Sequence, residues 1–153
     1  MTIPSSTPEL TAHLGFWLRT VSNHVSHAFA GKLAAKGVTV AEWVMMRALF
    51  EKEPLPPSQL AKDMSMTRGA ISKLADRLIA KSLLVRTAGR DDGRTQTLAL
   101  TDLGADLVPQ LAALADQNDA AFFDHLSQGE RQMLEQILKR IVERSEMTAL
   151  PTK

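Results

Sequence analysis

The sequence contains no cysteine, which excludes disulfide bonds, thiolate metal sites and thiol-based redox sensing. No apolar run approaches the length of a membrane-spanning helix, so no membrane partner is expected. Residues 1–8 are rich in Pro, Ser and Thr, and they lack the basic start and apolar core of a signal peptide. We therefore expect a cytoplasmic protein in which residues 1–8 form a flexible lead.

Several motifs that carry enzyme chemistry are also missing. The chain has no glycine-rich phosphate loop, no Gly-x-Ser-x-Gly and no His-Glu-x-x-His. The carboxylates of Asp91 and Asp92 are clustered, but Arg90 and Arg94 flank them in a short polar loop. This inventory predicts that the protein is not an enzyme and carries no cofactor.

His24 and His27 lie one helical turn apart, a spacing that can place two imidazoles on one metal ion. The sequence forces no third ligand beside them, although Glu42, Asp116 or His125 could approach. Solvated histidines, or histidines in a subunit interface, are the simpler interpretation, and in an interface they could make assembly sensitive to pH. No metal site is predicted.

Charge is unevenly distributed along the 153 residues, although the formal net charge is only +1. Residues 58–94 hold eight Lys/Arg and four Asp/Glu, whereas residues 102–146 hold four Lys/Arg and nine Asp/Glu. Chance scatter in a short chain is one explanation. A basic middle segment also suits contact with DNA. The acidic flank would repel the DNA and so help to orient the protein as it docks.

Two helical patterns with a short connection occupy the basic segment. The first, residues 58–64, directs Leu60, Ala61 and Met64 inward, and Thr67 can cap the second by accepting hydrogen bonds from its first N–H groups. The second helix buries one face made of Ile71, Leu74, Ala75 and Leu78. Its other face carries Arg68, Gly69, Ser72, Lys73, Asp76 and Arg77. Small residues and cations at the start of a helix suit entry into a major groove, so we predict a helix-turn-helix.

A β-hairpin is predicted directly after the second helix. Residues 83–87 and 95–100 are rich in β-branched and apolar side chains, and Asp92-Gly93 between them is a strong turn signal. Arg90 and Arg94 would lie at the tip of this wing, where a cationic finger can reach a minor groove or its phosphates. Hairpin tips are often charged, but a position after a helix-turn-helix favours contact with DNA.

This region resembles the MarR family of bacterial winged helix-turn-helix regulators, and the resemblance extends over nearly the whole chain. It is carried by Leu60-Ala61-x-x-Met64-x-Met66-Thr67-Arg68-x-x-Ile71-Ser72-x-Leu74-x-Asp76-Arg77-Leu78, then Lys81-x-Leu83-Leu84-x-Arg86, Asp92-x-Arg94 and Leu98-x-Leu100-Thr101. The Asp-x-Arg wing followed by Leu-Thr is its most specific part. The resemblance implies a mainly α fold with a small β-hairpin wing, and a homodimer that binds a double-stranded DNA operator.

The resemblance also assigns roles within the wing. Arg94 would be the minor-groove arginine, and Asp92 would brace the wing against Arg77 or Arg86, between which the sequence does not choose. The predicted DNA contacts are Ser58, Thr67, Arg68, Gly69, Ala70, Ser72, Lys73, Arg77, Arg86, Arg90 and Arg94. Many members carry bulk where this chain has Gly69-Ala70, so specificity should shift toward Arg68, Ser72, Lys73 and DNA shape.

Helices before and after the winged region are expected to join two copies of the chain. Residues 9–37 and 102–147 form the predicted dimerisation region, residues 38–101 the winged helix-turn-helix domain, and residues 148–153 a frayed tail. The first segment carries an apolar stripe interpreted as domain core, made of Leu10, Leu14, Trp17, Leu18, Val21, Val25 and Ala28. Two-fold pairing would set the two reading helices about 34 to 36 Å apart, which matches a palindromic operator.

The helix boundaries follow from caps and breakers. A long first helix is expected from about Pro8 to Lys36, ended by Gly37. The pairs Thr39/Glu42 and Ser127/Glu130 are capping boxes, Thr101 can cap the helix after the wing, and Pro109 should bend that helix.

A second stripe on the first helix is half polar, made of His13, Phe16, Thr20, His24 and His27, and is interpreted in part as a subunit or ligand surface. A set of aromatic and cationic side chains suits an aromatic or phenolic acid as effector: Phe16, Trp17, Trp43, Met46 and Arg47. An ordinary helix core is the alternative for these residues.

The sequence therefore predicts a dimeric, sequence-specific transcriptional repressor that a small ligand releases from its operator. The alternative is a winged-helix module for protein contact, or for architectural DNA binding with weak specificity and no effector. The two differ in sequence preference, because specific regulators favour their sites over random DNA by about 10³-fold or more.

Overall fold

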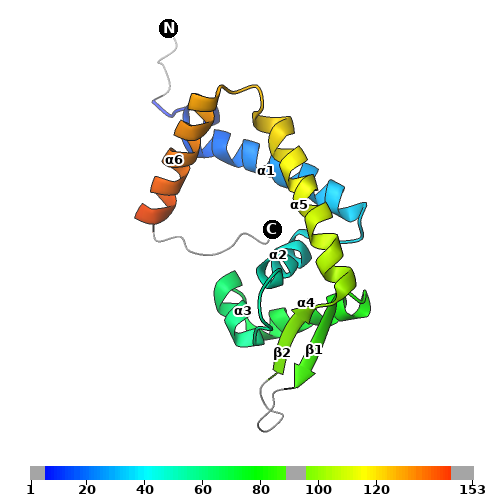
Figure 1. Ribbon diagram of the computed structural model, residues 1–153. Helices are drawn as coiled ribbons and strands as arrows, with labels where there is room; N and C mark the ends of the chain where they lie inside the picture. The colour runs from blue at the N-terminus through cyan, green and yellow to red at the C-terminus, as the bar shows by residue number, and fades with distance from the viewer. Residues whose placement is uncertain (1–5, 89–95, 146–153) are drawn as a thin grey trace.

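The computed structural model describes residues 6–88 and 96–145 (Figure 1). In chain order the elements are a 3₁₀ helix η1 (Leu10–Ala12), α1 (Leu14–Ala34), α2 (Val40–Leu49), α3 (Pro57–Met64), α4 (Arg68–Ala80), β1 (Leu84–Ala88), β2 (Gln96–Leu100), α5 (Asp102–Phe123) and α6 (Gln128–Arg144). Helices α2, α3 and α4 gather around the base of the hairpin, and α5 leads from there to the end where α6 lies. The predicted fold class, mainly α with a small hairpin wing, is confirmed.

Hydroxyl side chains begin several of these helices where the sequence placed caps. Thr67 accepts from the Ala70 backbone N–H at 3.1 Å, and Thr101 accepts from Gly104 at 3.0 Å. Complete capping boxes open α2 at Thr39 and α6 at Ser127. Each such cap stabilises its helix by about 1 kcal/mol, because it satisfies a backbone donor that has no partner within the helix.

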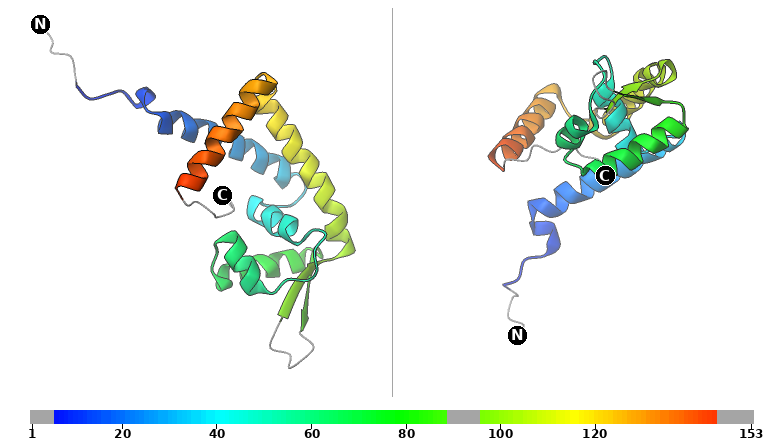
Figure 2. Two further views of the ribbon diagram at one scale, coloured as in Figure 1. Left: turned by 60° about the vertical axis from the view of Figure 1, so that its left-hand side comes forward. Right: turned by 90° about the horizontal axis from the view of Figure 1, so that it is seen from below.

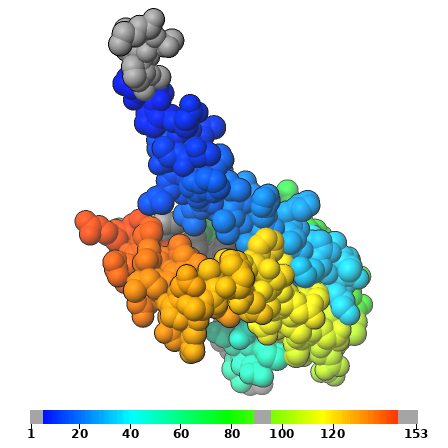
Figure 3. All heavy atoms as spheres, turned by 90° about the horizontal axis from the view of Figure 1, so that it is seen from above, coloured from blue at the N-terminus to red at the C-terminus, as the bar shows by residue number. Residues whose placement is uncertain are grey.

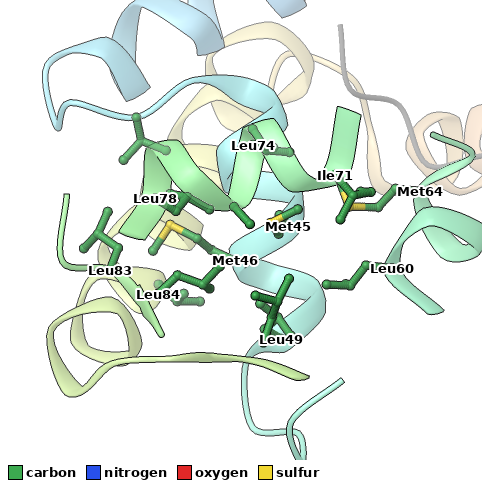
Figure 4. Close-up of a cluster of buried hydrophobic side chains, with 14 of the residues drawn as sticks. Met45, Met46, Leu49, Leu60, Met64, Ile71, Leu74, Leu78, Leu83 and Leu84 are labelled. Carbon is green, nitrogen blue, oxygen red and sulfur yellow. The ribbon is translucent and has the colours of Figure 1, made fainter. Parts of the chain in front are cut away.

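The hydrophobic core lies between α2, α3, α4 and the hairpin (Figure 4). Met45 and Met46 of α2 lie next to the buried side of α4, Leu49 lies farther along α2, and Leu60 and Met64 of α3 close one end of the cluster. The predicted inward face of α4 is buried, at Ile71, Leu74, Ala75 and Leu78. Removing one such side chain from water contributes about 1.5 to 3 kcal/mol, so this cluster fixes the orientation of α4.

A short turn joins α3 to α4, as the helix-turn-helix prediction requires. Ser65 adopts a left-handed conformation with φ of +51°, and the next N–H, that of Met66, donates to the Ala61 carbonyl at 2.9 Å. Left-handed backbone ends α3 abruptly and reverses the chain within a few residues. The turn therefore sets the angle between α3 and α4.

The wing is an antiparallel pair in which Leu84 lies opposite Leu100 and Ala88 opposite Gln96. Leu55, between α2 and α3, adds a bridge to Leu98 through hydrogen bonds of 3.0 and 2.7 Å in the two directions. Leu84 and Leu98 are buried, so the base of the hairpin is part of the domain core. The predicted turn at Asp92-Gly93 lies outside the described residues.

The start of the first helix differs from the prediction. The expected helix from Pro8 is replaced by η1, an extended residue at His13, and α1 from Leu14. The Thr11 carbonyl accepts a hydrogen bond from the Trp17 indole N–H at 2.8 Å, so its partner is a side chain and not a backbone N–H of a continuous helix. A glycine at position 15 also lowers helix propensity at this point. The helix end is close to the prediction, because α1 stops at Ala34 and Gly37 has φ of +76°.

The interpretation of the first apolar stripe of α1 as domain core is wrong for its N-terminal half. Leu14 is 87% exposed and Trp17 50% exposed, and Leu10, Leu18 and Val21 are also exposed. The physical reason is position: this half of α1 projects beyond α5 and the winged region, and the short η1 packs beside it without covering the stripe (Figures 2 and 3). In α1 only the C-terminal Leu33 is fully buried.

Besides its buried Val108 and Leu111, contacts at two points along α5 hold it to the rest of the chain. At its start, Gly104 lies so close to the Leu83 carbonyl that any added Cβ would overlap it, and the Thr101 hydroxyl donates to the Ser82 carbonyl at 2.7 Å. Farther along, the buried amide of Asn118 accepts from Lys32 at 2.9 Å and donates to the Val25 carbonyl at 3.0 Å. The helix continues through Pro109 as one element.

Helix α6 contributes nothing to the core. It has no buried residue, and its apolar side chains are exposed at Met133, Leu134, Ile137, Leu138, Ile141 and Val142. From the connection after Phe123 it diverges from α5 (Figure 1). None of the helices in the described ranges is both long and apolar enough to cross a bilayer.

Candidate nucleic-acid interface

Helix α4 presents the face that the sequence assigned to DNA. Arg68, Gly69, Ser72 and Lys73 are exposed, and Ala70 is half-buried. Residues four apart share a row on a helix, so Arg68 and Ser72 form one row beside a second row of Gly69 and Lys73. The first two turns of α4 thus offer two cations, one hydroxyl and a position without a side chain.

Exposed hydroxyls also lie at the starts of α3 and α4, at Ser58 and Thr67. The Thr67 oxygen accepts from the Ala70 N–H, which leaves the hydroxyl proton free to be donated to a phosphate oxygen. Ser58 is exposed in the first turn of α3, directly after Pro57 at the N1 position. Unpaired N–H groups at helix starts carry partial positive charge and favour anionic oxygens.

A buried carboxylate ties the far end of α4 to α2. The Glu42 side chain is 0% exposed, and it accepts from Lys81 Nζ at 2.8 and 2.9 Å and from the Thr39 N–H at 2.8 Å. Arg77 lies 3.5 Å from the same carboxylate through Nε and donates to the Thr39 hydroxyl at 3.2 Å. Lys81 also donates to the Gly37 carbonyl at 2.8 Å. The network joins the start of α2 to the last turn of α4.

The protonation of Glu42 follows from these neighbours. Burial alone would raise the pKa of the carboxyl group. The hydrogen bond from Lys81, that from the Thr39 backbone, and the charges of Lys81 and Arg77 outweigh burial and lower the pKa from its ordinary value of 4.5. Glu42 is therefore ionised at neutral pH, and its negative charge is offset by the two cations.

The sequence assigned Arg77 to DNA or to bracing Asp92. It assigned Glu42 to a cap and named it as a candidate third metal ligand, so it missed this network. Arg77 is still partly exposed, but its guanidinium is directed to Glu42 and Thr39. Two cations spaced four apart near a helix end, together with an acidic residue at the start of an earlier helix, are a signal for such a network. That signal becomes specific only when the fold brings positions 42 and 81 together.

Arg86 also has a partner within the described residues. Its Nη2 lies 3.0 Å from the Asp76 carboxylate, which joins β1 to the exposed face of α4. Both candidates for bracing Asp92, namely Arg77 and Arg86, thus contact other carboxylates. Asp92 itself, with Arg90 and Arg94, lies outside the described residues, so their assigned roles stay predictions.

The structure divides the residues assigned to an effector. Phe16 packs edge-on against Trp17, with ring centroids 5.2 Å apart, near the start of α1. Trp43 of α2 packs against Phe29 of α1, with ring centroids 6.4 Å apart. Phe29 follows Phe16 by 13 residues of helix, which span roughly 20 Å, so the two aromatic pairs are far apart. Arg47 lies exposed over the Phe50 ring at 5.6 Å. Met46 is fully buried in the core, so this set does not line one pocket in the described chain.

Two hollows lie elsewhere on the surface. A hollow of about 1110 Å³ opens between the end of α5 and α6, with apolar walls at Phe123, Leu126, Leu134, Leu138 and Val142. A second, of about 510 Å³, lies between Lys36, Lys81, Leu83 and Leu107. Neither includes the five residues assigned to an effector.

The histidine pair gains no further ligands in the part of the chain that the structure describes. Across residues 6–88 and 96–145, no three His, Asp or Glu side chains gather closely enough to hold a metal ion. Glu42, one of the candidate third ligands, is bound to Lys81.

Comparisons with known proteins agree with this arrangement. Residues 38–95 match the model of the MarR family. An uncharacterised HTH-type transcriptional regulator of Bacillus cereus is 29% identical over 143 residues, covering 88% of this chain and 92% of the relative. Two solved structures share the fold with a TM-score of 0.76 each. MepR from S. aureus in complex with DNA is 21% identical, covering 86% of this chain and 98% of that one. CouR from Rhodococcus jostii RHA1 bound to p-coumaroyl-CoA is 22% identical, and the match covers 95% of this chain and 100% of CouR.

Replacing Glu42 with Gln tests the buried network. The uncharged amide weakens the hold on Lys81 and Arg77, and we expect a loss of about 1 to 3 kcal/mol at pH 7, moderated because both cations are partly exposed. Because the folded-state pKa of Glu42 is lowered, its contribution is present above pH 4.5 and is lost as the pH falls through the folded pKa. Urea unfolding at pH 7 and at acid pH should therefore show a smaller pH dependence in Glu42→Gln.

Glu130→Gln is the matched control for this change. Glu130 occupies the same place in the α6 capping box and accepts from the Ser127 N–H at 2.9 Å, but no Lys or Arg contact is recorded for it in the described residues. Equal effects of the two substitutions on the free energy of unfolding would show that the cap alone, and not the cations, explains the role of Glu42.

Proposed function

We propose that this protein is a homodimeric repressor that a small ligand releases from a palindromic operator. The proposal starts from the family of the chain, the MarR family of winged helix-turn-helix transcriptional regulators. These regulators bind DNA and are not enzymes. The observation that carries the proposal is the exposed face of α4. Small and cationic side chains occupy its first two turns, while its opposite face is buried in the core.

In this proposal α4 enters the major groove by its first turns. Arg68 and Lys73 contact phosphates or guanine edges, and the Ser72 hydroxyl donates to or accepts from a base. Thr67 and Ser58 donate to phosphate oxygens, which fixes the register of the helix on the duplex. The cationic wing residues Arg90 and Arg94 reach the flanking minor groove, a role that rests on the sequence alone.

Substitution on the α4 face should separate phosphate contact from base reading. We expect Ser72→Ala and Lys73→Ala to reduce the preference for a selected site over random duplex by about 5- to 100-fold, since each removes a donor from the reading face. Arg94→Ala should instead weaken binding to all duplexes and lower the salt slope by about 1. The measurement is a titration of duplexes that the wild-type protein selects from a random pool.

Lys36→Ala, in the turn after α1, is the charge-matched control and should bind as wild type does. Unchanged binding in all three test variants would refute the docking proposed here. A wild-type protein that selects no sequence, and prefers none by 10³-fold, would favour the architectural alternative.

The proposed dimer is supported by apolar surface that one copy leaves uncovered. The α6 side chains Leu134, Ile137, Leu138 and Ile141 recur at helical spacing on an exposed face, and the N-terminal half of α1 exposes a second stripe. Soluble monomers rarely expose contiguous apolar area of this kind. A two-fold pair would cover both stripes and set two α4 helices one DNA turn apart.

A charge placed in this face should separate the two copies. Leu138 is 38% exposed, and we expect Leu138→Glu to give a monomer at micromolar concentration and to weaken operator binding at least tenfold, because a buried unpaired carboxylate opposes association. Leu103 on α5 is 57% exposed, and Leu103→Glu is the control that should remain a dimer. Sedimentation velocity measures both. A monomeric wild-type protein would contradict the proposal.

For the effector we propose a site at Trp43 and Arg47, where an aromatic ring and an exposed cation lie one turn apart on α2. This pair suits an aromatic acid, whose ring stacks on apolar walls and whose carboxylate pairs with the guanidinium. The binding of p-coumaroyl-CoA by CouR, a protein of the same fold, supports a ligand of aromatic character. Release then follows from a population shift, because the ligand binds better to the arrangement that cannot span the operator.

Tryptophan fluorescence tests this site directly. Titration with phenolic acids such as 4-hydroxybenzoate should quench or shift the emission, and the response should survive in Trp17→Phe and disappear in Trp43→Phe. Arg47→Ala should raise the dissociation constant about tenfold, because it removes the charge-assisted hydrogen bond. Unaltered emission with every acid at millimolar concentration would leave these residues as ordinary core.

A further inference from the structure

Gly69 occupies an open position on the exposed side of α4. A Cβ built there meets a single atom within 4 Å, the Thr67 hydroxyl oxygen at 4.0 Å. Its backbone is helical, so the left-handed conformations that call for glycine are not involved. The contrast is Gly104, where an added Cβ would overlap the Leu83 carbonyl. Folding therefore requires glycine at position 104 and does not require it at position 69.

Glycine at position 69 lowers the stability of the α4 helix, and no contact within the chain requires it. Among ordinary residues glycine is the poorest helix former, because the unfolded chain gains the most freedom from it. Alanine would fit the space and favour the helix. Gly15, Gly31 and Gly129 are equally open, but Gly69 differs from them in lying among the exposed cationic and small residues at the start of α4. A reason for glycine at this position is therefore sought in what approaches the surface of α4.

We infer that Gly69 is a specificity-determining residue of the DNA interface, kept free of a side chain so that a base-pair edge can contact the helix backbone. Lys73 follows Gly69 in the same row, and Arg68 and Ser72 form the adjacent row, so polar groups border a notch with an apolar floor. A floor of backbone Cα suits the methyl group of thymine, the one apolar group that a base pair presents in the major groove. This inference rests on the proposed function.

The steric consequence is direct. Any residue other than glycine adds at least one C–C bond length, about 1.5 Å, between helix and base edge. Contacts made by the ends of the long, flexible Arg68 and Lys73 side chains tolerate such a shift, whereas a contact to the backbone itself does not. Gly69 substitution should therefore reduce sequence preference more than overall affinity for DNA.

The experiment compares Gly69→Ala with Gly129→Ala. Gly129 is the second residue of α6, as Gly69 is of α4, and its built Cβ likewise meets only the capping hydroxyl, that of Ser127, at 4.0 Å. Both substitutions should raise Tm by a similar small amount, roughly 2 °C. Binding is measured on the duplex selected by the wild-type protein from a random pool and on a scrambled duplex of equal length and composition.

We expect Gly69→Ala to bind the selected duplex at least tenfold more weakly and the scrambled duplex within twofold of wild type, while Gly129→Ala matches wild type on both. Gly69→Leu should lose the preference altogether, because its side chain fills the space that the base-pair edge would occupy. Selected-duplex binding by Gly69→Ala within twofold of wild type would overturn the inference and leave the proposed function intact. A wild-type protein that prefers no duplex would overturn both.

Discussion

The orientation of α4 depends on two attachments, one along its buried face and one near its end. Along one face, Ile71, Leu74 and Leu78 are buried in the core cluster with side chains of α2 and α3, and burial of each contributes about 1.5 to 3 kcal/mol. Near its end, the Glu42 carboxylate binds Lys81 and Arg77. Apolar contact resists separation but has little direction, whereas hydrogen bonds from two cations to one buried carboxylate fix rotation and register. Together they leave the first turns of α4 exposed and rigidly placed.

The same arrangement explains why cations on one helix have different roles. Arg68 and Lys73 near the start of α4 are directed to solvent, and Arg77 and Lys81 near its end are bound to Glu42. A DNA duplex attracts positive charge wherever it is offered, so cations engaged with a buried carboxylate contribute less to that attraction. Charge available to a polyanion is thus concentrated at the end of the helix that is proposed to enter the groove.

The chain also divides into a part that covers its own apolar surface and a part that does not. The winged region buries side chains from α2, α3, α4 and the hairpin against one another. The N-terminal half of α1 and the whole of α6 have no comparable partner among the described residues, although α5 is tied to α1 through Asn118 and Lys32. In the proposed dimer this uncovered surface joins the two copies, so the spacing of the two reading helices depends on surfaces far from the DNA. An effector bound near α1 and α2 would act on that spacing.

Local sequence determined the elements themselves. The hydroxyl at Thr67, the three-and-four spacing from Ile71 to Leu78 and the apolar, β-branched run before Thr101 are short-range signals, since they involve neighbours in the chain. Tertiary structure alone decided which surfaces became core. The stripe at Leu14 and Trp17 has the same pattern as a buried face but projects past the domain, and Met46 entered the core instead of a ligand site. It also decided the partner of Glu42, because no spacing within the sequence brings that residue to Lys81; only the packing of α2 across α4 does.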